Sequence, residues 1–116
     1  RHGDARFVCA DLFDPAAECP FAAGSFDVVF CSGTFNLNLG NNLQFVPAAL
    51  SRLIPLSRRW VVFNMLHCRA RGPDRRYFYY DPEEVVAMVR PYGCEVRVVD
   101  DYLANDFTVV CLRGGA

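Results

Sequence analysis

The chain contains 116 residues, of which 53% are hydrophobic, and its formal net charge is −1. This length and composition predict a single soluble globular domain. The near-neutral charge excludes the strongly basic surface that attracts DNA or an anionic membrane, and no apolar run approaches the ~20 residues that span a bilayer.

The first part of the chain predicts two strands separated by a loop. Residues 5–13, ARFVCADLF, predict a strand that ends near Ala10 or Asp11. Prolines and a glycine mark residues 14–24 as a loop. Residues 26–32, FDVVFCS, predict a second strand, whose unbroken apolar character is typical of a parallel strand buried on both faces.

The remainder predicts two helices and three strands. Residues 43–54 carry apolar side chains at helical spacing, and Pro47 leaves the start of this helix open. A second helix begins after Asp81, which suits an N-cap, and ends before Pro91. The other expected elements are a buried strand, a long basic loop and two strands of a closing hairpin, at residues 59–66, 67–79, 95–102 and 106–112.

This order of elements predicts an α/β fold, an open and mostly parallel sheet with one antiparallel strand. Ligands of such sheets bind beyond the carboxyl ends of the strands. The turn SGTF, residues 32–35, follows the second strand at that edge. Gly33 allows close approach to the backbone, while Ser32 and Thr34 offer hydrogen bonds. The alternative is an ordinary turn between a strand and a helix.

Three residue types narrow the possible functions. All twelve basic residues are arginines, so the sequence lacks a P-loop lysine and a Schiff-base lysine. The two histidines, His2 and His67, are too few and too scattered for a histidine-based metal site. The six cysteines show no C-x-x-C spacing, and several lie in apolar runs. We therefore predict reduced cysteines and a cytoplasmic protein, with an oxidised, secreted domain as the alternative.

Residues 10–35, ADLFDPAAECPFAAGSFDVVFCSGTF, resemble the middle of a class I S-adenosylmethionine-dependent methyltransferase. In that family a strand ends in an acidic and then an apolar residue, as Asp11 and Leu12 do. A loop similar to CPFAAGSFD, residues 19–27, leads into the next strand. The closing hairpin DDYLANDFTVVCL, residues 100–112, also matches. The resemblance extends from about Arg6 to Arg113 and implies a Rossmann-like fold.

The resemblance implies a set of residues for S-adenosyl-L-methionine. Asp11 would accept a hydrogen bond from the adenine amine, the backbone N–H of Leu12 would meet a ring nitrogen, and Leu12 or Phe13 would cover a face of the ring. Cys31, Ser32 and Gly33 would line the sulfonium and methionine portion. From the sequence alone, Asp11 could equally be a turn residue that caps the following segment.

The substrate pocket is expected beside this segment. Methyl transfer from a sulfonium depends mainly on position and orientation, so no catalytic residue is assigned. His67 follows a strand at the ligand edge, and histidine is a residue type suited to act as a general base near neutral pH. The alternative is that His67 is simply exposed, as loop histidines often are. Phe35 could face the substrate or belong to the core. The candidates for the pocket are Thr34, Phe35, Asn36, His67 and Tyr80.

Two family motifs are not found in these 116 residues. They are the glycine-rich G-x-G-x-G turn after the first strand and the acidic residue after the second. The family's strand order, 3-2-1-4-5-7-6, would leave roughly 14 Å between the first two strands of this chain. Residues 1–116 are thus expected to form a partial domain that lacks the first two strands. Its open edge predicts self-association.

The hypothesis for function is therefore part of a methyltransferase that acts on a small molecule. The arginines of residues 69–76 suit an anionic group, unless this segment is only a solvated loop. SGTF stands where methyltransferases of nucleobase amines carry N-P-P-[YF], which argues against DNA. The alternatives are a cofactor-free interaction module or scaffold, and a Rossmann-like enzyme that uses a nicotinamide.

Overall fold

The computed structural model describes residues 6–14 and 16–114. The sequence-based statements on His2 and Pro15 lie outside these residues. Two α-helices, α1 (Asn42–Leu53) and α2 (Pro82–Val89), each continue into a short 3-10 turn. The 3-10 turns and the strands found in the described part of the chain are η1 (Ile54–Leu56), η2 (Arg90–Tyr92), β1 (Phe26–Cys31), β2 (Ser57–His67), β3 (Tyr79–Tyr80), β4 (Glu95–Val99) and β5 (Asp106–Leu112).

The strands form one sheet in the order β1-β2-β5-β4, with β3 paired to the end of β2. Strands β1 and β3 run parallel to β2, whereas β5 runs antiparallel to both β2 and β4. Only β5 therefore runs against the other described strands, as the sequence predicted. The predicted α/β class is confirmed.

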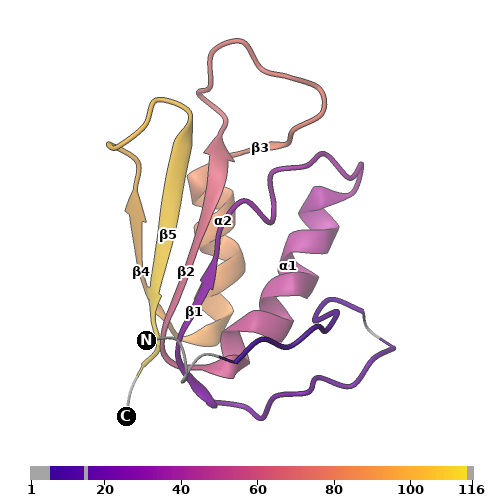
Figure 1. The fold of residues 1–116 in the computed structure, drawn as a ribbon. Coiled ribbons are helices and arrows are strands. Elements are labelled where there is room, and N and C mark those ends of the chain that lie inside the picture. The colour runs from indigo at the N-terminus through magenta and orange to yellow at the C-terminus, as the bar shows by residue number, and fades with distance from the viewer. Residues whose placement is uncertain (1–5, 15, 115–116) are drawn as a thin grey trace.

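Both helices lie on the same face of this sheet (Figure 1). Side chains of a strand alternate between its two faces, so every second residue of β2 reaches the helices. Val61, Phe63 and Met65 are such residues, and each is fully buried. They meet buried side chains of α1 and α2 in a single core. We call this side of the sheet the covered face.

The opposite side, the open face, corrects a prediction. Strand β1 was expected to be buried on both faces, but Val28 and Phe30 are 52% and 65% exposed. Trp60, the partner of Val28 on β2, is also exposed. Only the alternate residues, Val29 and Cys31, pack against the core. Double burial fails because, among the described residues, no helix covers this face.

The predicted first strand is a second correction. Residues 6–14 contain no strand, and Phe7 and Val8 are 94% and 59% exposed. A strand needs a neighbour to accept its backbone hydrogen bonds, and this segment pairs with none of the described strands. The loop that follows is confirmed, and the backbone N–H of Gly24 anchors it to the carbonyl oxygen of Pro55 at 2.8 Å.

The helix starts follow local chemistry. The carboxylate of Asp81 accepts a hydrogen bond from the backbone N–H of Glu83 at 2.9 Å, which confirms it as the N-cap of α2. Helix α1 begins one residue before its predicted start and keeps Pro47 within it. The closing hairpin is confirmed as well, although β4 ends at Val99 and leaves residues 100–105 as a longer connection.

Candidate functional site

Two loops meet where β1 and β2 end. Because these strands are parallel, their carboxyl ends lie at the same edge of the sheet, which is the upper edge in Figure 1. The backbone N–H of Phe78 donates to the carbonyl oxygen of Asn36 at 2.9 Å. The backbone N–H of Asn38 donates to the carbonyl oxygen of Arg76 at 2.8 Å. These bonds join residues 32–41 to residues 68–78. We call the two segments together the rim.

The turn that follows β1 is held by a side chain of β2. The backbone N–H of Gly33 donates to Oδ1 of Asn64 at 2.7 Å, and Nδ2 of Asn64 donates to Oγ of Ser32 at 3.0 Å. Gly33 has a φ of 71°, which glycine adopts at no steric cost. Cys31 adds a bond from Sγ to Oγ1 of Thr34 at 3.2 Å.

Sequence reasoning did not identify Asn64. The feature that could have pointed to it is the amide side chain within the apolar run WVVFNML. Asparagine is rare inside strands, so its presence there suggests a specific role. The structure thus brings Cys31, Ser32 and Gly33 together at the end of β1, and it adds Asn64 to them.

Phe35 and Tyr80, two of the substrate-pocket candidates, lie in the core. They are 2% and 1% exposed, and the hydroxyl of Tyr80 donates to the carbonyl oxygen of Phe35 at 3.0 Å. Burial raises the pKa of Tyr80 above its ordinary value. These side chains support the rim from below and offer little surface to a ligand.

A buried amide completes this support. Nδ2 of Asn42 donates to the hydroxyl of Tyr80 and to the carbonyl oxygen of Leu37, both at 2.9 Å. Its Oδ1 accepts the backbone N–H of Leu39 at 2.8 Å. Asn42 is only 2% exposed, so these bonds compensate its burial and fix the rim to the start of α1. Sequence reasoning did not identify this role of Asn42.

Residues 11–13 form a turn that packs against the core. The carboxylate of Asp11 accepts the backbone N–H of Phe13 at 3.0 Å, which matches the alternative of a turn residue. The ring of Phe13 lies 6.4 Å from that of Phe35 and 5.6 Å from that of Phe45. Leu12 is also partly buried against the core. The structure therefore brings Phe13 close to the segment after β1, while Asp11 stays exposed.

His67 is held on two sides. Its Nδ1 accepts the backbone N–H of Arg69 at 3.1 Å, and its Nε2 lies 3.8 Å from a carboxylate oxygen of Asp100. Its side chain is 11% exposed, and its ring packs edge-on against Phe107. Arg69 binds the carbonyl oxygen of Ala104 at 3.1 Å. These contacts connect the end of β2 to residues 100–105, so His67 presents little surface to the rim.

The basic part of the rim is already partly neutralised. Arg76 binds the carboxylate of Asp74 at 2.7 Å and lies over the ring of Tyr77. The Arg76 hydrogen bonds lower the pKa of Asp74 to about 2. Among the described residues, the side chains of Arg71 and Arg75 make no ion pair. These two arginines are the available cations of the rim.

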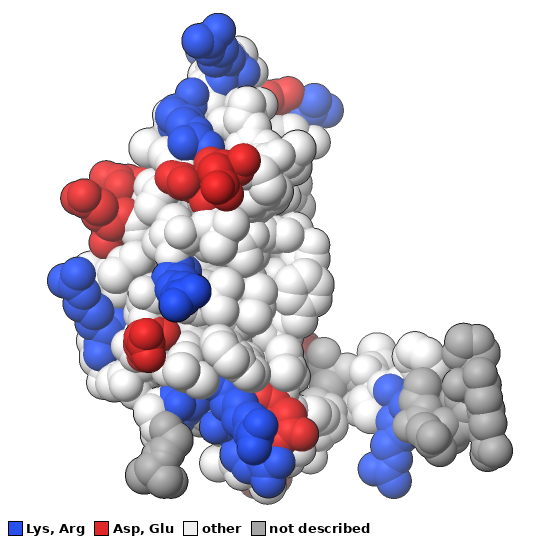
Figure 2. Space-filling model, turned by 90° about the vertical axis from the view of Figure 1, so that its left-hand side faces the viewer, with Lys and Arg blue, Asp and Glu red and all other residues white. Residues whose placement is uncertain are grey.

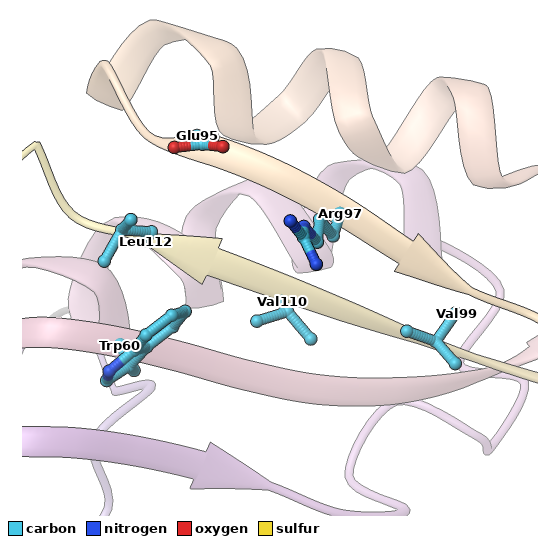
Figure 3. A pocket seen from close by; sticks show the side chains of 6 residues that line it. All are labelled: Trp60, Glu95, Arg97, Val99, Val110 and Leu112. Atoms are coloured by element: carbon cyan, nitrogen blue, oxygen red, sulfur yellow. The ribbon is translucent and has the colours of Figure 1, made fainter.

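A shallow pocket lies on the open face, away from the rim. Figure 3 shows its side chains projecting from β2, β4 and β5 on the side of the sheet opposite the helices. Figure 2 shows an uncharged area toward the right of this view, with charged side chains above it, below it and along its left side. The pocket is lined by Trp60, Glu95, Arg97, Val99, Val110 and Leu112.

No family model and no curated protein matches the sequence. The fold matches magnesium protoporphyrin IX methyltransferase from Synechocystis, solved with bound SAH, at 12% identity and a TM-score of 0.58, over 93% of this chain and 51% of that one. It matches a SAM-dependent methyltransferase from Aquifex aeolicus at 20% identity and a TM-score of 0.56, over 93% and 54%.

A third match is a SAM-dependent methyltransferase from Thermotoga maritima, described as a possible histamine N-methyltransferase. The identity is 10% and the TM-score 0.58, over 90% of this chain and 62% of that one. The chain thus spans about half to three fifths of the structures that it matches. The resemblance to S-adenosylmethionine-dependent methyltransferases is confirmed for the fold.

Proposed function

We propose that the chain is part of a class I S-adenosylmethionine-dependent methyltransferase. Residues 11–13, Cys31 and the rim would together form one wall of the cofactor site. The observation that carries this proposal is the turn at Ser32 and Gly33, held by Asn64 at the carboxyl edge of a parallel strand pair. Cofactors of open α/β sheets bind at this edge. The likeness of the fold to three methyltransferases supports the same conclusion.

The exposed polar groups of the chain suit this cofactor. The carboxylate of Asp11 is an acceptor for the adenine amine, and the hydroxyl of Ser32 is a donor for an oxygen of the ligand. Leu12 and Phe13 offer apolar surface for the adenine, while Cys31 and Gly33 flank the methionine portion. S-adenosylmethionine supplies an activated methyl group, so these residues need only bind and orient it.

The acceptor is proposed to be a small molecule that carries an anionic group. Leu37, Leu39 and Tyr77 are exposed on the rim, which also carries Arg71 and Arg75. Exposed apolar side chains and unpaired guanidinium groups on the same rim favour an apolar molecule with a carboxylate or phosphate over a nucleic acid. Thr34 and Asn36 would contact it, while Phe35, Tyr80 and His67 would shape the pocket from behind. No catalytic residue is assigned.

The site of action is proposed to be the cytoplasm, where the six cysteines would stay reduced. All six are unpaired in the structure. In the described part of the chain, no helix has the length and apolar character required to cross a bilayer.

The test is a titration of the purified chain with S-adenosylhomocysteine, followed by backbone NMR. We expect shifts of the amides of Phe13, Ser32 and Gly33, which lie at the proposed wall. Replacing Asp11 by alanine should weaken binding by about threefold to tenfold, the effect of one lost hydrogen bond. Shifts confined to the open face, or none at all, would contradict the proposal. A parallel titration with NADH tests the nicotinamide alternative. Binding of NADH would favour that alternative.

A second candidate function is an interaction module, and the exposed apolar side chains of β1 favour it. Val28 and Phe30 lie on β1, one edge of which is unpaired among the described residues, and free edges pair with other strands. We propose that the chain self-associates through this edge. Sedimentation velocity should show dimers that dissociate in Val28→Lys, because a charge on the edge opposes pairing. A wild-type chain that sediments as a monomer at 100 μM would contradict this proposal.

A further inference from the structure

We infer that Asn64 is a positioning residue that holds the turn after β1 and leaves the hydroxyl of Ser32 as a hydrogen-bond donor to the ligand. This inference rests on the proposed function and specifies how the chain would meet the cofactor. Asn64 lies on β2 and reaches across to the end of the neighbouring strand β1. Its side chain is half-buried on the open face, two residues beyond Val62.

The chemistry of the two hydrogen bonds fixes the orientation of the amide. A backbone N–H can only donate, so the atom of Asn64 that faces Gly33 at 2.7 Å must be the oxygen. The NH₂ group then faces Oγ of Ser32 at 3.0 Å and must donate to it. Exchanging the two amide atoms would oppose donor to donor at Gly33.

This arrangement determines what Ser32 can offer. Its oxygen accepts from Asn64, so its own hydrogen is directed elsewhere. Ser32 is exposed at the edge of the sheet, where a ligand can reach it. Its hydroxyl is therefore a donor for an acceptor atom of the ligand. The N–H of Gly33, by contrast, is already used by Asn64 and is not a ligand donor.

The turn also depends on this contact for its shape. Gly33 has a positive φ, and its carbonyl oxygen accepts the backbone N–H of Asn36 at 3.4 Å within the turn. Its own N–H donates to Asn64, and this hydrogen bond ties the amide of Gly33 to the sheet. Phe35, which follows, is fixed by its burial and by Tyr80. Asn64 and Phe35 therefore hold the turn from both sides.

The first part of the test concerns the turn alone and uses hydrogen exchange of the Gly33 amide, measured by NMR on the purified chain. Asn64→Leu removes both hydrogen bonds and should speed exchange by about threefold to tenfold. Asn64→Asp keeps an acceptor for the N–H and should retain the protection. Asn105→Asp is the matched control, because Asn105 is exposed and lies outside the rim, in the connection between β4 and β5. Unchanged exchange in Asn64→Leu would overturn the positioning role.

The second part concerns the ligand and uses the dissociation constant of S-adenosylhomocysteine. A carboxylate at position 64 cannot donate, so Ser32 would turn its hydrogen inward. Asn64→Asp and Ser32→Ala should each weaken binding by about threefold to tenfold. The double variant should lose no more than either single one, because both remove the same donor. Wild-type affinity in Asn64→Asp would overturn the donor role.

The two parts separate this inference from the proposed function. If the wild-type chain protects the Gly33 amide but binds no S-adenosylhomocysteine, the proposed function fails, the donor role fails with it, and the positioning role stands. If the chain binds the ligand and Asn64→Leu changes neither exchange nor affinity, the inference fails and the proposed function stands. Circular dichroism and thermal melting of each variant establish that it is folded.

Discussion

The covered and the open face of the sheet are built from the same strands but differ in what they meet. On β2, Phe63 faces the helices and is fully buried, whereas Trp60 faces away from them and is 38% exposed. On β1, Val29 packs against the core while Phe30 is 65% exposed. Apolar residues therefore occupy both faces, although only one has a helical layer in the described part of the chain.

This difference shows that an apolar side chain in a strand can lie either in the core or at the surface. Its apolar character alone does not determine which. An open apolar face is typical of a surface that a partner or a further segment covers. The chain spans about half the length of two of the methyltransferase structures that it matches. The stability of the chain alone should accordingly depend on the covered face.

The strongest test of this comparison replaces one phenylalanine on each face. Phe63→Ala should lower the free energy of unfolding by about 3–5 kcal/mol, because it leaves a cavity beside Phe35. Phe30→Ala should cost less than about 1 kcal/mol, because most of that ring is already in water. Urea unfolding gives both values. Equal losses would mean that the open face is covered in solution, for example by a second copy of the chain.

A smaller effect is expected from two tyrosine hydroxyls. Tyr80→Phe leaves the buried amide of Asn42 short of a partner and should cost about 1–3 kcal/mol. Tyr102→Phe is the matched control, since Tyr102 is 45% exposed and its hydroxyl meets Thr108, which lies on the open face. It should cost no more than about 0.5 kcal/mol. If the two variants melt alike, the buried network contributes nothing beyond an exposed hydrogen bond.

The smallest effect concerns alkaline pH. Burial on the covered face raises the pKa of Cys111 to about 12, from an ordinary value of 9.0. A thiol whose pKa is higher in the folded than in the unfolded state stabilises the fold below pH 9, and this contribution is lost as the pH rises toward 12. Between pH 7 and pH 10 the loss should be about 1.4 kcal/mol.

The check is urea unfolding of the wild type and of Cys111→Ala at both pH values. The alanine variant should be less stable at pH 7 but should lose less stability on going to pH 10. Tyr80 contributes in the same direction above pH 10, because burial also raises its pKa, so the comparison stops there. Parallel pH dependence in the two proteins would show that the thiol ionises equally in the folded and unfolded states.

The candidate site was only partly accessible to sequence reasoning. The turn at Ser32 and Gly33 could be predicted, because a glycine directly after an apolar strand marks a turn at a sheet edge. Asn64 lies 31 residues from Gly33, and nothing local to either residue announces their hydrogen bond. The sequence allowed two interpretations for each of Phe35 and His67, namely a buried side chain or one accessible to a ligand. Only the tertiary contacts of these residues decide between the two.

The sequence by itself determined the local elements of this protein. The Asp81 cap, the strands β1 and β2 and the closing hairpin all follow from residues within a few positions of one another. Only the tertiary structure decided which face is buried, why residues 6–14 form no strand, and how Asn64 holds the turn. The physical reason is that propensity and periodicity depend on neighbours along the chain, whereas burial and strand pairing depend on what lies across the sheet.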